Sequence, residues 1–340
     1  HIAGYREHPA VEVVAIADIN PANLLHYQKE LTIPRAYTPA HEMLAAEKLD
    51  IVSVAVPNID HKALTVAALE AGANVLCEKP MALNAAEAEE MLAVAKKRKR
   101  KLGINFSYRF HPQSRAMKAM AEAGALGDIY FGRTIWHRRR GVPGLAAGNF
   151  NSGGASGNWF FDKSRSGGGP LIDLGVHRLD LALWVMGYPE PEWVMANTFN
   201  HFGPGIAKAK GFDYTVEDLA CAMIRFKNGA MLEIEASWAA NVRENENMST
   251  QLLGTKGGIR QFNLNETYEF DVDYTYEAHG AQFDTKLHMP APPCKSGYYL
   301  FADAVIKKEP FLVAPEEGVT VMRLLDAIYR SAREGKPIKL

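Results

Sequence analysis

Cysteine is scarce in this chain, and the three that occur, Cys77, Cys221 and Cys294, stand far apart. Their odd number and the lack of any Cys-X-X-Cys pair argue against a disulfide framework and a structural zinc site. Free thiols suit a reducing compartment, so we expect a cytoplasmic protein. Long hydrophobic runs are lacking too, because no apolar stretch reaches the roughly 20 residues that a membrane-spanning helix needs.

An excess of charge of one sign is also absent, since 38 basic residues oppose 39 acidic ones and leave a net charge of −1. No overall field therefore favours nucleic acid or an anionic membrane. The basic run at residues 96–101 (KKRKRK) falls at the end of an expected helix, where cations complement the helix dipole and stay solvated. Because no aromatic residues interleave with it, a solvated face explains it better than a nucleic-acid site. We expect neither nucleic acid nor a membrane as a partner.

The length of 340 residues, 47% of them hydrophobic, is sufficient for two domains. In the first part, apolar runs with many β-branched residues alternate with helical patterns. Strands are expected at 11–17, 51–56, 74–77 and 102–106, and helices at 21–30, 61–71 and 84–99. Uniformly apolar strands separated by helices predict an α/β domain with a Rossmann-type, doubly wound parallel sheet, which we assign to residues 1–110.

The pattern changes in residues 111–340. Helices are expected at 113–123, 170–186 and 318–333, and strands at 129–136, 219–226, 230–238 and 249–253. Asn228-Gly229 lies between two of these strands and predicts a hairpin. We therefore expect an α+β domain with a large, open, mostly antiparallel sheet and few helices.

A dinucleotide-binding domain of the first kind carries a GxGxxG turn about twenty residues before the acidic residue that ends its second strand. Asp18 is placed to be that residue, but it lies too close to His1 for such a turn to fit. We expect the sequence to begin inside the first helix of a longer molecule, with an intact protein that has a different first unit as the alternative. What precedes His1, including a targeting segment, stays open.

Several polar side chains directly follow the predicted parallel strands, at the edge of the sheet where ligands bind. Asp18 can hold both ribose hydroxyls of an adenosine, and a carboxylate repels a 2′-phosphate, so NAD is favoured over NADP. A helix N-cap is the other explanation of Asp18. Pro57 and Asn58 follow another strand, and His61 begins the next helix, although a turn and a helix start explain these three equally well.

Glu78 and Lys79 follow the strand that ends at Cys77. A lysine held there, partly desolvated beside a cationic nicotinamide, can donate to a substrate oxygen and take up or release a proton. Glu78 is within reach of the nicotinamide ribose. A surface lysine before the turn at Pro80 is the alternative.

Asp173 and His177 lie four residues apart on an expected helix and share one face. The imidazole can abstract a proton while the carboxylate orients the substrate or the base. As a metal site this pair supplies only two ligands, so we expect no metal. The alternative is that these two residues form a structural pair at a contact between the two domains.

A glycine- and asparagine-rich segment, residues 141–169, precedes that helix and contains Asn149, Asn151, Asn158 and Trp159. Asparagine offers neutral hydrogen-bond partners and tryptophan a flat apolar surface, which together suit a polyol. A disordered loop or a loop in a subunit contact is the alternative. Arg138-Arg139-Arg140 leads into the segment and either touches a substrate oxyanion or stays solvated.

Three motifs together resemble the glucose–fructose oxidoreductase/inositol dehydrogenase (Gfo/Idh/MocA) family: VAVPNIDH at 54–61, CEKPMALN at 77–84 and GGGPLIDLGVHRLDLALW at 167–184. The resemblance extends to LLGTKGGI at 252–259 and so covers essentially the whole chain. It implies that Lys79 is the catalytic lysine, Asp173 the substrate-orienting carboxylate and His177 the general base. The positions that it implies for cofactor contacts are Asp18, Pro57, Asn58, His61, Glu78, Lys79 and Arg109. The family's glycine-rich turn has no counterpart here, so its phosphate contacts are not assigned.

The resemblance also implies an activity and an assembly. We expect an NAD-dependent dehydrogenase that oxidises a secondary hydroxyl of a sugar, a sugar derivative or a cyclitol, with Lys79, Trp159, Asp173 and His177 binding the substrate. Homodimers or homotetramers are expected to form through the C-terminal sheet. Two alternatives remain: a non-enzymatic sensor that binds NAD or a sugar, and an NAD-dependent glycosidase in which cleavage is assisted by transient redox chemistry. The intact set of Lys79, Asp173 and His177 argues against the sensor.

Overall fold

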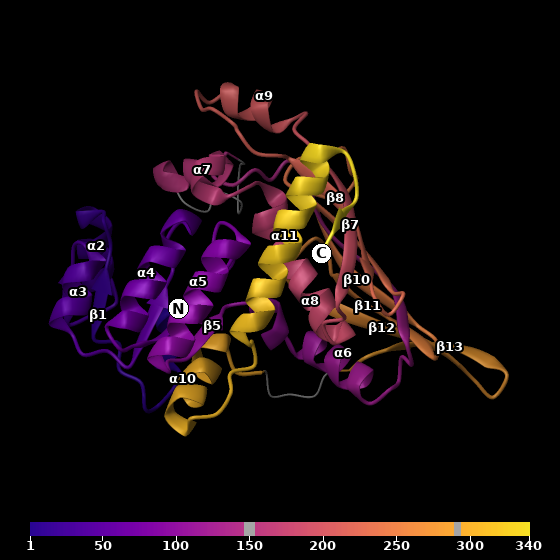
Figure 1. Cartoon of the computed structure of the whole chain (residues 1–340), viewed down its shortest axis with the longest axis horizontal. Helices are drawn as coiled ribbons and strands as arrows, with labels where there is room; N and C mark the ends of the chain where they lie inside the picture. Colours follow the sequence, from indigo (N-terminus) through magenta and orange to yellow (C-terminus); the bar gives the residue numbers. More distant parts are fainter. Residues whose placement is uncertain (146–153, 289–293) are drawn as a thin grey trace. The chain divides into compact units, whose positions relative to one another are not determined.

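The computed structural model describes residues 1–145, 154–288 and 294–340, and the chain divides into two compact units (Figure 1). The first unit contains residues 1–105 and 295–319, and the second contains residues 106–294 and 320–340. The sequence predicts a single boundary at residue 110, whereas residues 295–319 return to the first unit. The cause of this return is apolar packing, because Phe301 is fully buried in a core cluster with Tyr5 and Leu76.

The first unit confirms the parallel α/β architecture. β1 pairs with β2, and β3, β4 and β5 form a second sheet in that order, with every pairing parallel. Figure 1 shows α4 and α5 side by side next to these strands. The elements are α1 (Ile2–Arg6), β1 (Ala15–Ala17), α2 (Pro21–Glu30), β2 (Arg35–Tyr37), α3 (Ala40–Ala46), β3 (Ile51–Val54), α4 (Asn58–Glu70), β4 (Asn74–Cys77), α5 (Ala85–Arg98), β5 (Leu102–Ile104) and α10 (Gly297–Lys307).

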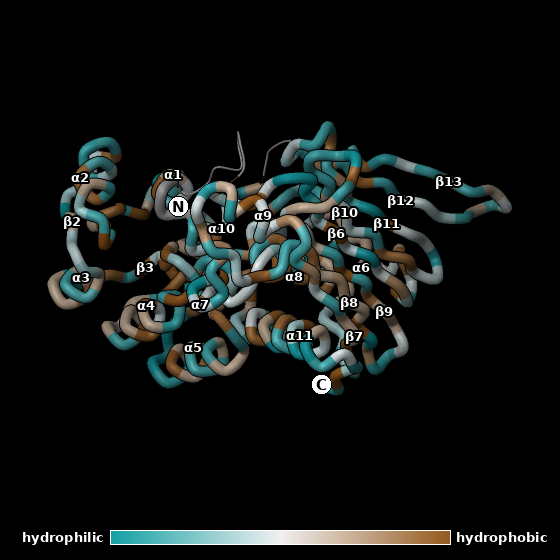
Figure 2. Tube along the Cα trace, turned by 90° about the horizontal axis from the view of Figure 1, so that it is seen from above, coloured by the Kyte–Doolittle hydropathy of each residue, from teal (hydrophilic) through white to brown (hydrophobic). Residues whose placement is uncertain are grey.

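An apolar cavity of about 780 Å³ lies between the strand edges of β1 and β3. Residues 10–17 and 48–56 contribute to its lining. β1 is shorter than the strand expected at 11–17, and of residues 11–14 Val14 accepts a backbone hydrogen bond from Arg35 at the start of β2. The observed order, β2-β1 followed by β3-β4-β5, corresponds to 3-2 and 4-5-6 of a doubly wound 3-2-1-4-5-6 sheet. In Figure 2 the path of β3 is largely hydrophobic.

The second unit is built on a nine-stranded sheet with the order β13-β12-β11-β10-β6-β9-β8-β7-β14. Only β6 and β9 pair in parallel, which confirms a mostly antiparallel sheet. Its elements are η1 (Ser107–Phe110), α6 (Pro112–Glu122), β6 (Ile129–Arg138), η3 (Gly154–Phe161), α7 (Lys163–Ser166), η4 (Leu171–Gly175), α8 (Val176–Met186), β7 (Pro191–Phe199), α9 (Gly203–Lys208), β8 (Leu219–Phe226), β9 (Met231–Ser237), β10 (Glu246–Gly254), β11 (Gly257–Asn263), β12 (Phe270–Ala278), β13 (Ala281–Lys286) and β14 (Ile338–Lys339). A long helix, α11 (Pro315–Glu334), begins in the first unit and continues in the second.

Local sequence explains several of these elements. The hairpin expected at Asn228-Gly229 joins β8 to β9, and Gly229 takes the positive φ that such a turn requires. Asn84 caps α5, as its side-chain oxygen accepts a hydrogen bond from the backbone N–H of Glu87 at 3.0 Å. Within the described ranges, none of the helices combines the length and the apolar character needed to cross a bilayer.

One face of the nine-stranded sheet is covered and the other is open. α8 packs against β6 and β10, and α6 against β11 and β12 (Figure 1). Burial alternates along the central strands, so that on β6 Thr134 and Trp136 are buried while Arg133 is exposed. The β12–β13 hairpin beyond the covered region is mostly hydrophilic in Figure 2.

A buried ion pair fixes α8 to the segment before α6. Arg109 donates to Asp180 through Nε at 2.9 Å, and both side chains are fully buried. The hydroxyl of Tyr188 completes the pair, at 2.7 Å from Arg109 Nη2 and 2.8 Å from Asp180 Oδ1. The Arg109 guanidinium also lies over the rings of Phe106 and Trp184. Each charge is therefore compensated inside the core of the second unit.

We predict that Asp180→Ala lowers the free energy of unfolding by about 3–5 kcal/mol, because it leaves the buried Arg109 charge without its partner. Denaturant titration measures the loss. The control is Glu192→Ala, which breaks the half-exposed pair with Arg225 and should cost less than about 1 kcal/mol. Equal losses in the two variants would contradict the assignment of Asp180 as a core counter-ion.

Candidate active site

In the first unit, Asp18 directly follows β1. Its Oδ1 accepts a hydrogen bond from the backbone N–H of Asn20 at 2.7 Å, and Asn20 itself caps α2 by accepting from Ala22 at 2.9 Å. The N-cap is therefore Asn20 and not Asp18. No hydrogen bond from the described residues reaches Asp18 Oδ2. A half-buried carboxylate with one fixed and one available oxygen fits the paired hydroxyls of an adenosine ribose.

The loops after β3 and β4 are tied together by His61. Its side chain is 1% exposed; Nδ1 lies 2.7 Å from the carbonyl oxygen of Pro80 and Nε2 lies 2.9 Å from that of Val56. Burial lowers the pKa of His61, so the neutral ring donates one hydrogen bond from one nitrogen at a time. This enclosure indicates that His61 positions the two loops, rather than touching a cofactor as the resemblance implies.

Pro57 precedes α4 and is partly exposed, whereas Asn58, the first residue of α4, is 6% exposed. Both lie at the carboxyl end of β3, where the sequence placed them. Asn58 has a polar partner within the structure. At this edge Pro57 is therefore more accessible to a cofactor than the Asn58 side chain.

Glu78 and Lys79 follow β4 and are both partly buried. Glu78 Oε1 lies 2.8 Å from His1 Nε2 and accepts from Asn105 Nδ2 at 2.6 Å, while Oε2 accepts from the backbone N–H of Lys79 at 3.2 Å. These contacts hold the strand end rigidly. The Glu78 carboxylate thus fixes the backbone from which the Lys79 side chain departs.

In the second unit, Asp173 lies on η4 and His177 on α8. Among residues 171–185 these two are the only ones that are not buried. η4 is a single turn of π-helix, a distortion that frequently occurs at functional sites. An otherwise buried helix thus presents one carboxylate and one imidazole, as the spacing predicts.

Asp173 is oriented by a residue that sequence analysis did not identify. The indole Nε1 of Trp238, which is fully buried, donates to Asp173 Oδ2 at 3.0 Å. Trp238 follows β9, 65 residues away in sequence. Its only sequence signal was an aromatic residue at a strand end.

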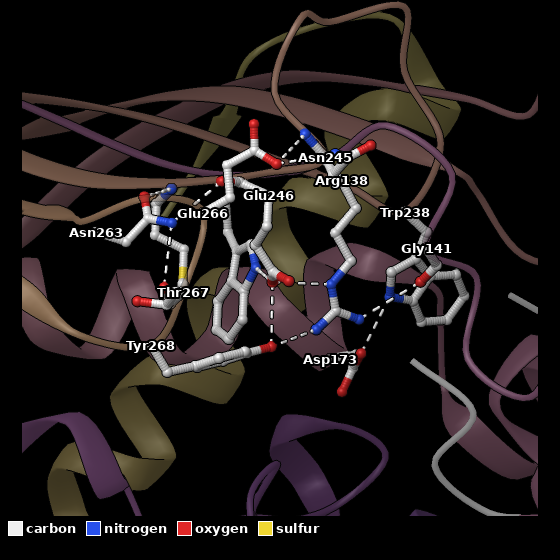
Figure 3. Close-up of polar contacts among 12 residues, drawn as sticks. Arg138, Gly141, Asp173, Trp238, Asn245, Glu246, Asn263, Glu266, Thr267 and Tyr268 are labelled. Atoms are coloured by element: carbon white, nitrogen blue, oxygen red, sulfur yellow. Dashed lines mark hydrogen bonds and ion pairs between the residues drawn. The ribbon is translucent and has the colours of Figure 1, made fainter. Parts of the chain in front are cut away.

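Beside Trp238 lies a second buried network, centred on the ion pair of Arg138 with Glu246 (Figure 3). Arg138 Nε donates to Glu246 Oε1 at 3.0 Å and Nη2 donates to Tyr268 OH at 2.8 Å. Trp136 Nε1 donates to the same Glu246 oxygen at 2.6 Å. Arg138 is therefore a core residue and is not solvated.

The ring of His177 lies against two of the surrounding aromatic residues. The Tyr108 ring meets it edge-on at a centroid distance of 5.2 Å, and the Trp136 ring lies at 5.8 Å. Because Trp136 is held by Glu246, these contacts fix the orientation of the imidazole. The arrangement suits a base whose ring must point in one direction.

Arg109 and Trp159 were also expected to lie at the site. Arg109, which the resemblance places near cofactor and substrate, is fully buried in its pair with Asp180, so the structure supports a structural role for it. Trp159 is partly exposed and stacks on Phe160 at a centroid distance of 3.9 Å, and its neighbour Asn158 is exposed. Asn149 and Asn151 lie outside the described residues.

The turn before η4 is held by Glu217, which is buried. Its carboxylate accepts from the backbone N–H groups of Gly169 at 2.9 Å and Leu171 at 3.1 Å, and from Tyr329 OH at 2.8 Å. Burial raises the pKa of Glu217. A Cβ on Gly169 would lie 2.2 Å from the backbone oxygen of Glu217, so the close approach requires glycine there.

Comparison with known proteins gives matches along nearly the whole chain. Residues 1–106 match the family model "Oxidoreductase family, NAD-binding Rossmann fold", and residues 114–260 match "GFO/IDH/MocA C-terminal domain". The D-glucoside 3-dehydrogenase of Escherichia coli is 30% identical over 345 residues, which cover 100% of this chain and 93% of that protein. The myo-inositol 2-dehydrogenase of Thermotoga maritima is 28% identical over 330 residues, 96% of this chain and 90% of that protein.

Among solved structures, the aldose-aldose oxidoreductase of Caulobacter crescentus, complexed with glycerol, superimposes with a TM-score of 0.81. It is 25% identical in sequence, and the match covers 100% of this chain and 95% of that one. The architecture of both units is therefore shared with a solved oxidoreductase.

We predict that Gly169→Ala lowers the free energy of unfolding by about 1–3 kcal/mol and reduces turnover, since the added methyl displaces Glu217 and with it the start of η4. The control is Gly205→Ala in α9, where a Cβ meets nothing within 4 Å and φ is not positive. That variant should match the parent in denaturant midpoint and turnover. A Gly169→Ala protein that is equally stable would show that the turn has room to adjust.

Proposed function

This chain belongs to the Gfo/Idh/MocA family of oxidoreductases, and on that premise we propose that it oxidises a secondary hydroxyl of a sugar, a sugar derivative or a cyclitol with NAD. The observation that carries the proposal is the pair Asp173 and His177, the two accessible polar side chains of an otherwise buried helix. The names of two relatives, a glucoside and an inositol dehydrogenase, support this class of substrate.

The residues at the strand ends of the first unit fit NAD. Asp18 has a carboxylate oxygen available for the hydroxyls of the adenosine ribose, and Pro57 and Glu78 line the ends of the next two strands. His61 and Asn58 support these loops from within. When bound, NAD supplies the acceptor for the hydride.

In the proposed reaction, His177 accepts the proton of the substrate hydroxyl through its imidazole. Lys79 donates a hydrogen bond to the same oxygen and stabilises its developing negative charge. Loss of the hydroxyl proton, together with the hydride that bound NAD would accept from the carbinol carbon, would convert the alcohol into a ketone. Asp173, held by Trp238, accepts a hydrogen bond from a second substrate hydroxyl and fixes which carbon is presented.

Trp159 and Asn158 are proposed to contact the substrate as well. A partly exposed indole offers an apolar surface for the C–H face of a sugar, and the exposed amide beside it offers both a donor and an acceptor. The indole is stiffened by its stack on Phe160, which lowers the entropy lost on binding.

We also propose that the chain forms homodimers or homotetramers through the open face of the nine-stranded sheet. Met195 and Met223 pair across β7 and β8 on that face and are both exposed. Arg133, Glu233 and Glu235 form ion pairs beside them. A flat face that mixes exposed apolar and paired charged side chains is suited to a second copy. The three free cysteines are consistent with work in the cytoplasm.

A panel of sugars and cyclitols, incubated with the protein and NAD, tests the proposed reaction through the absorbance of reduced nicotinamide. The proposal requires net reduction with at least one member of the panel. Binding without reduction would indicate a sensor. Cleavage of a glycoside without net reduction would indicate redox-assisted hydrolysis.

We predict that NAD binds at least about tenfold more tightly than NADP, because an unpaired carboxylate at Asp18 should cost a 2′-phosphate more than ~1.4 kcal/mol. Titration of both cofactors measures the ratio, and Asp18→Asn should narrow it. Equal or tighter binding of NADP to the parent would remove Asp18 from the cofactor site.

We predict that Lys79→Ala and His177→Ala each lower kcat by about 10²–10⁴, as expected for groups that act on the transferred proton. Both variants should stay folded and bind NAD. Lys97→Ala, on the exposed side of α5, is the matched control and should keep the parental kcat. A variant that retains parental turnover would lose its assigned catalytic role.

A further inference from the structure

Arg178, the residue after His177, is an unusual charge for the interior of a protein. Its side chain is fully buried, and only Nη1 has a hydrogen-bond partner among the described residues, the side-chain oxygen of Gln261 at 3.1 Å. Nε and Nη2 are buried without one. Gln261 is neutral and donates in turn to Ser114 at 2.8 Å.

Aromatic rings surround this guanidinium where a carboxylate would be expected. The Arg178 carbon Cζ lies 4.5 Å from the ring centroid of Tyr108, 5.1 Å from that of Phe270 and 5.5 Å from that of Trp136. Burial lowers the pKa of Arg178, but arginine starts high enough to remain a cation at neutral pH. Aromatic faces stabilise a cation without cancelling its charge, as a carboxylate would.

Two of these rings also contact His177. Tyr108 and Trp136 lie at 5.2 and 5.8 Å from the imidazole, measured between ring centroids. The Arg178 guanidinium and the His177 imidazole both lie close to the Tyr108 ring. The two distances to the centroid of that ring add up to about 10 Å, so the two groups are no farther apart than this. Arg178 is fully buried and Tyr108 is 5% exposed, so water screens the field of the cation less than it would at the surface.

Two of the other ion pairs near His177 are internally balanced, because Arg138 is paired with Glu246 and Arg109 with Asp180. Asp173 accepts a hydrogen bond from the neutral indole of Trp238 and keeps its negative charge. The neutral titratable groups are Tyr108, His111 and Tyr268. The Arg178 charge also acts on His111. Burial is the main cause that lowers the pKa of His111, and the positive charge of Arg178 lowers it further. Among the described residues Arg178 thus forms no ion pair of its own, although the Glu246 carboxylate favours its charged form, and its positive charge opposes the negative charge of Asp173 at the candidate base.

We propose that Arg178 is a positioning residue whose buried charge disfavours protonation of His177 and so keeps the base neutral and ready at physiological pH. The inference rests on the proposed role of His177. Its physical cause is that an imidazolium would place a second positive charge within about 10 Å of the first. A charge at that distance, with an effective dielectric constant of about 20, changes an imidazole pKa by roughly one unit.

The test uses two neutralising variants and one conservative control. Arg178→Met removes the charge, and Gln261→Glu places a carboxylate against the intact guanidinium with no change in side-chain size. Arg178→Lys keeps the charge. The two neutralising variants should raise the pKa of His177 by about one unit, and Arg178→Lys should leave it within about a third of a unit.

The pKa is read in two ways. NMR titration of the imidazole, assigned with His177→Gln, measures it whether or not the protein turns over a substrate. In kinetics, a raised pKa moves the acidic limb of kcat/KM upward by about one pH unit, because more enzyme is protonated and inactive at a given pH. The kcat at high pH should change little.

The two readouts separate this inference from the function on which it depends. An unshifted His177 pKa in folded Arg178→Met and Gln261→Glu would overturn the role of Arg178, even if Lys79→Ala and His177→Ala abolish turnover. An equal shift in Arg178→Lys would show that packing, not charge, is responsible. If Arg178→Met does not fold, Gln261→Glu alone decides. A shifted NMR pKa with no dehydrogenase activity would support the electrostatic role and contradict the proposed function.

Discussion

The helix formed by η4 and α8 is buried on almost every side, and this burial constrains the rest of the second unit. A charge on the helix is costly where water cannot reach it, and its surroundings must stabilise it. Asp180 is neutralised by Arg109, and Arg178 is surrounded by aromatic rings. The helix start is held by Glu217. Among residues 171–185 only Asp173 and His177 remain partly exposed, so the enclosure that stabilises the helix also limits which of its polar side chains are accessible.

In the first unit, polar contacts hold the loops that follow the parallel strands. Its functional side chains lie on short loops after parallel strands, which are intrinsically mobile connections. His61 joins the loops after β3 and β4, and Glu78 clamps the backbone of Lys79 together with Asn105. The residues most enclosed at this edge therefore support the loops, while Asp18 and Lys79 are less enclosed.

Local pattern predicted much of the architecture. The expected strands at 74–77 and 219–226 and the helix at 21–30 match β4, β8 and α2 residue for residue. β7 and β11 to β13 were not expected, although β12 (FDVDYTYEA) alternates apolar and polar residues clearly, as a strand with one open face should. α10 was not expected, and the segment that contains it was placed with residues 111–340, since local pattern does not reveal which core a segment joins.

The sequence by itself determined which motifs are present: the carboxylate after β1, the Lys79 loop and the spacing of Asp173 and His177, because each depends on neighbours within a few residues. Tertiary structure alone decided how those groups are held. Trp238 lies 65 residues from Asp173, Glu246 lies 108 from Arg138, and Arg109 lies 71 from Asp180. Burial and charge compensation depend on side chains that the fold brings together from such distances, and spacing along the chain contains no record of them.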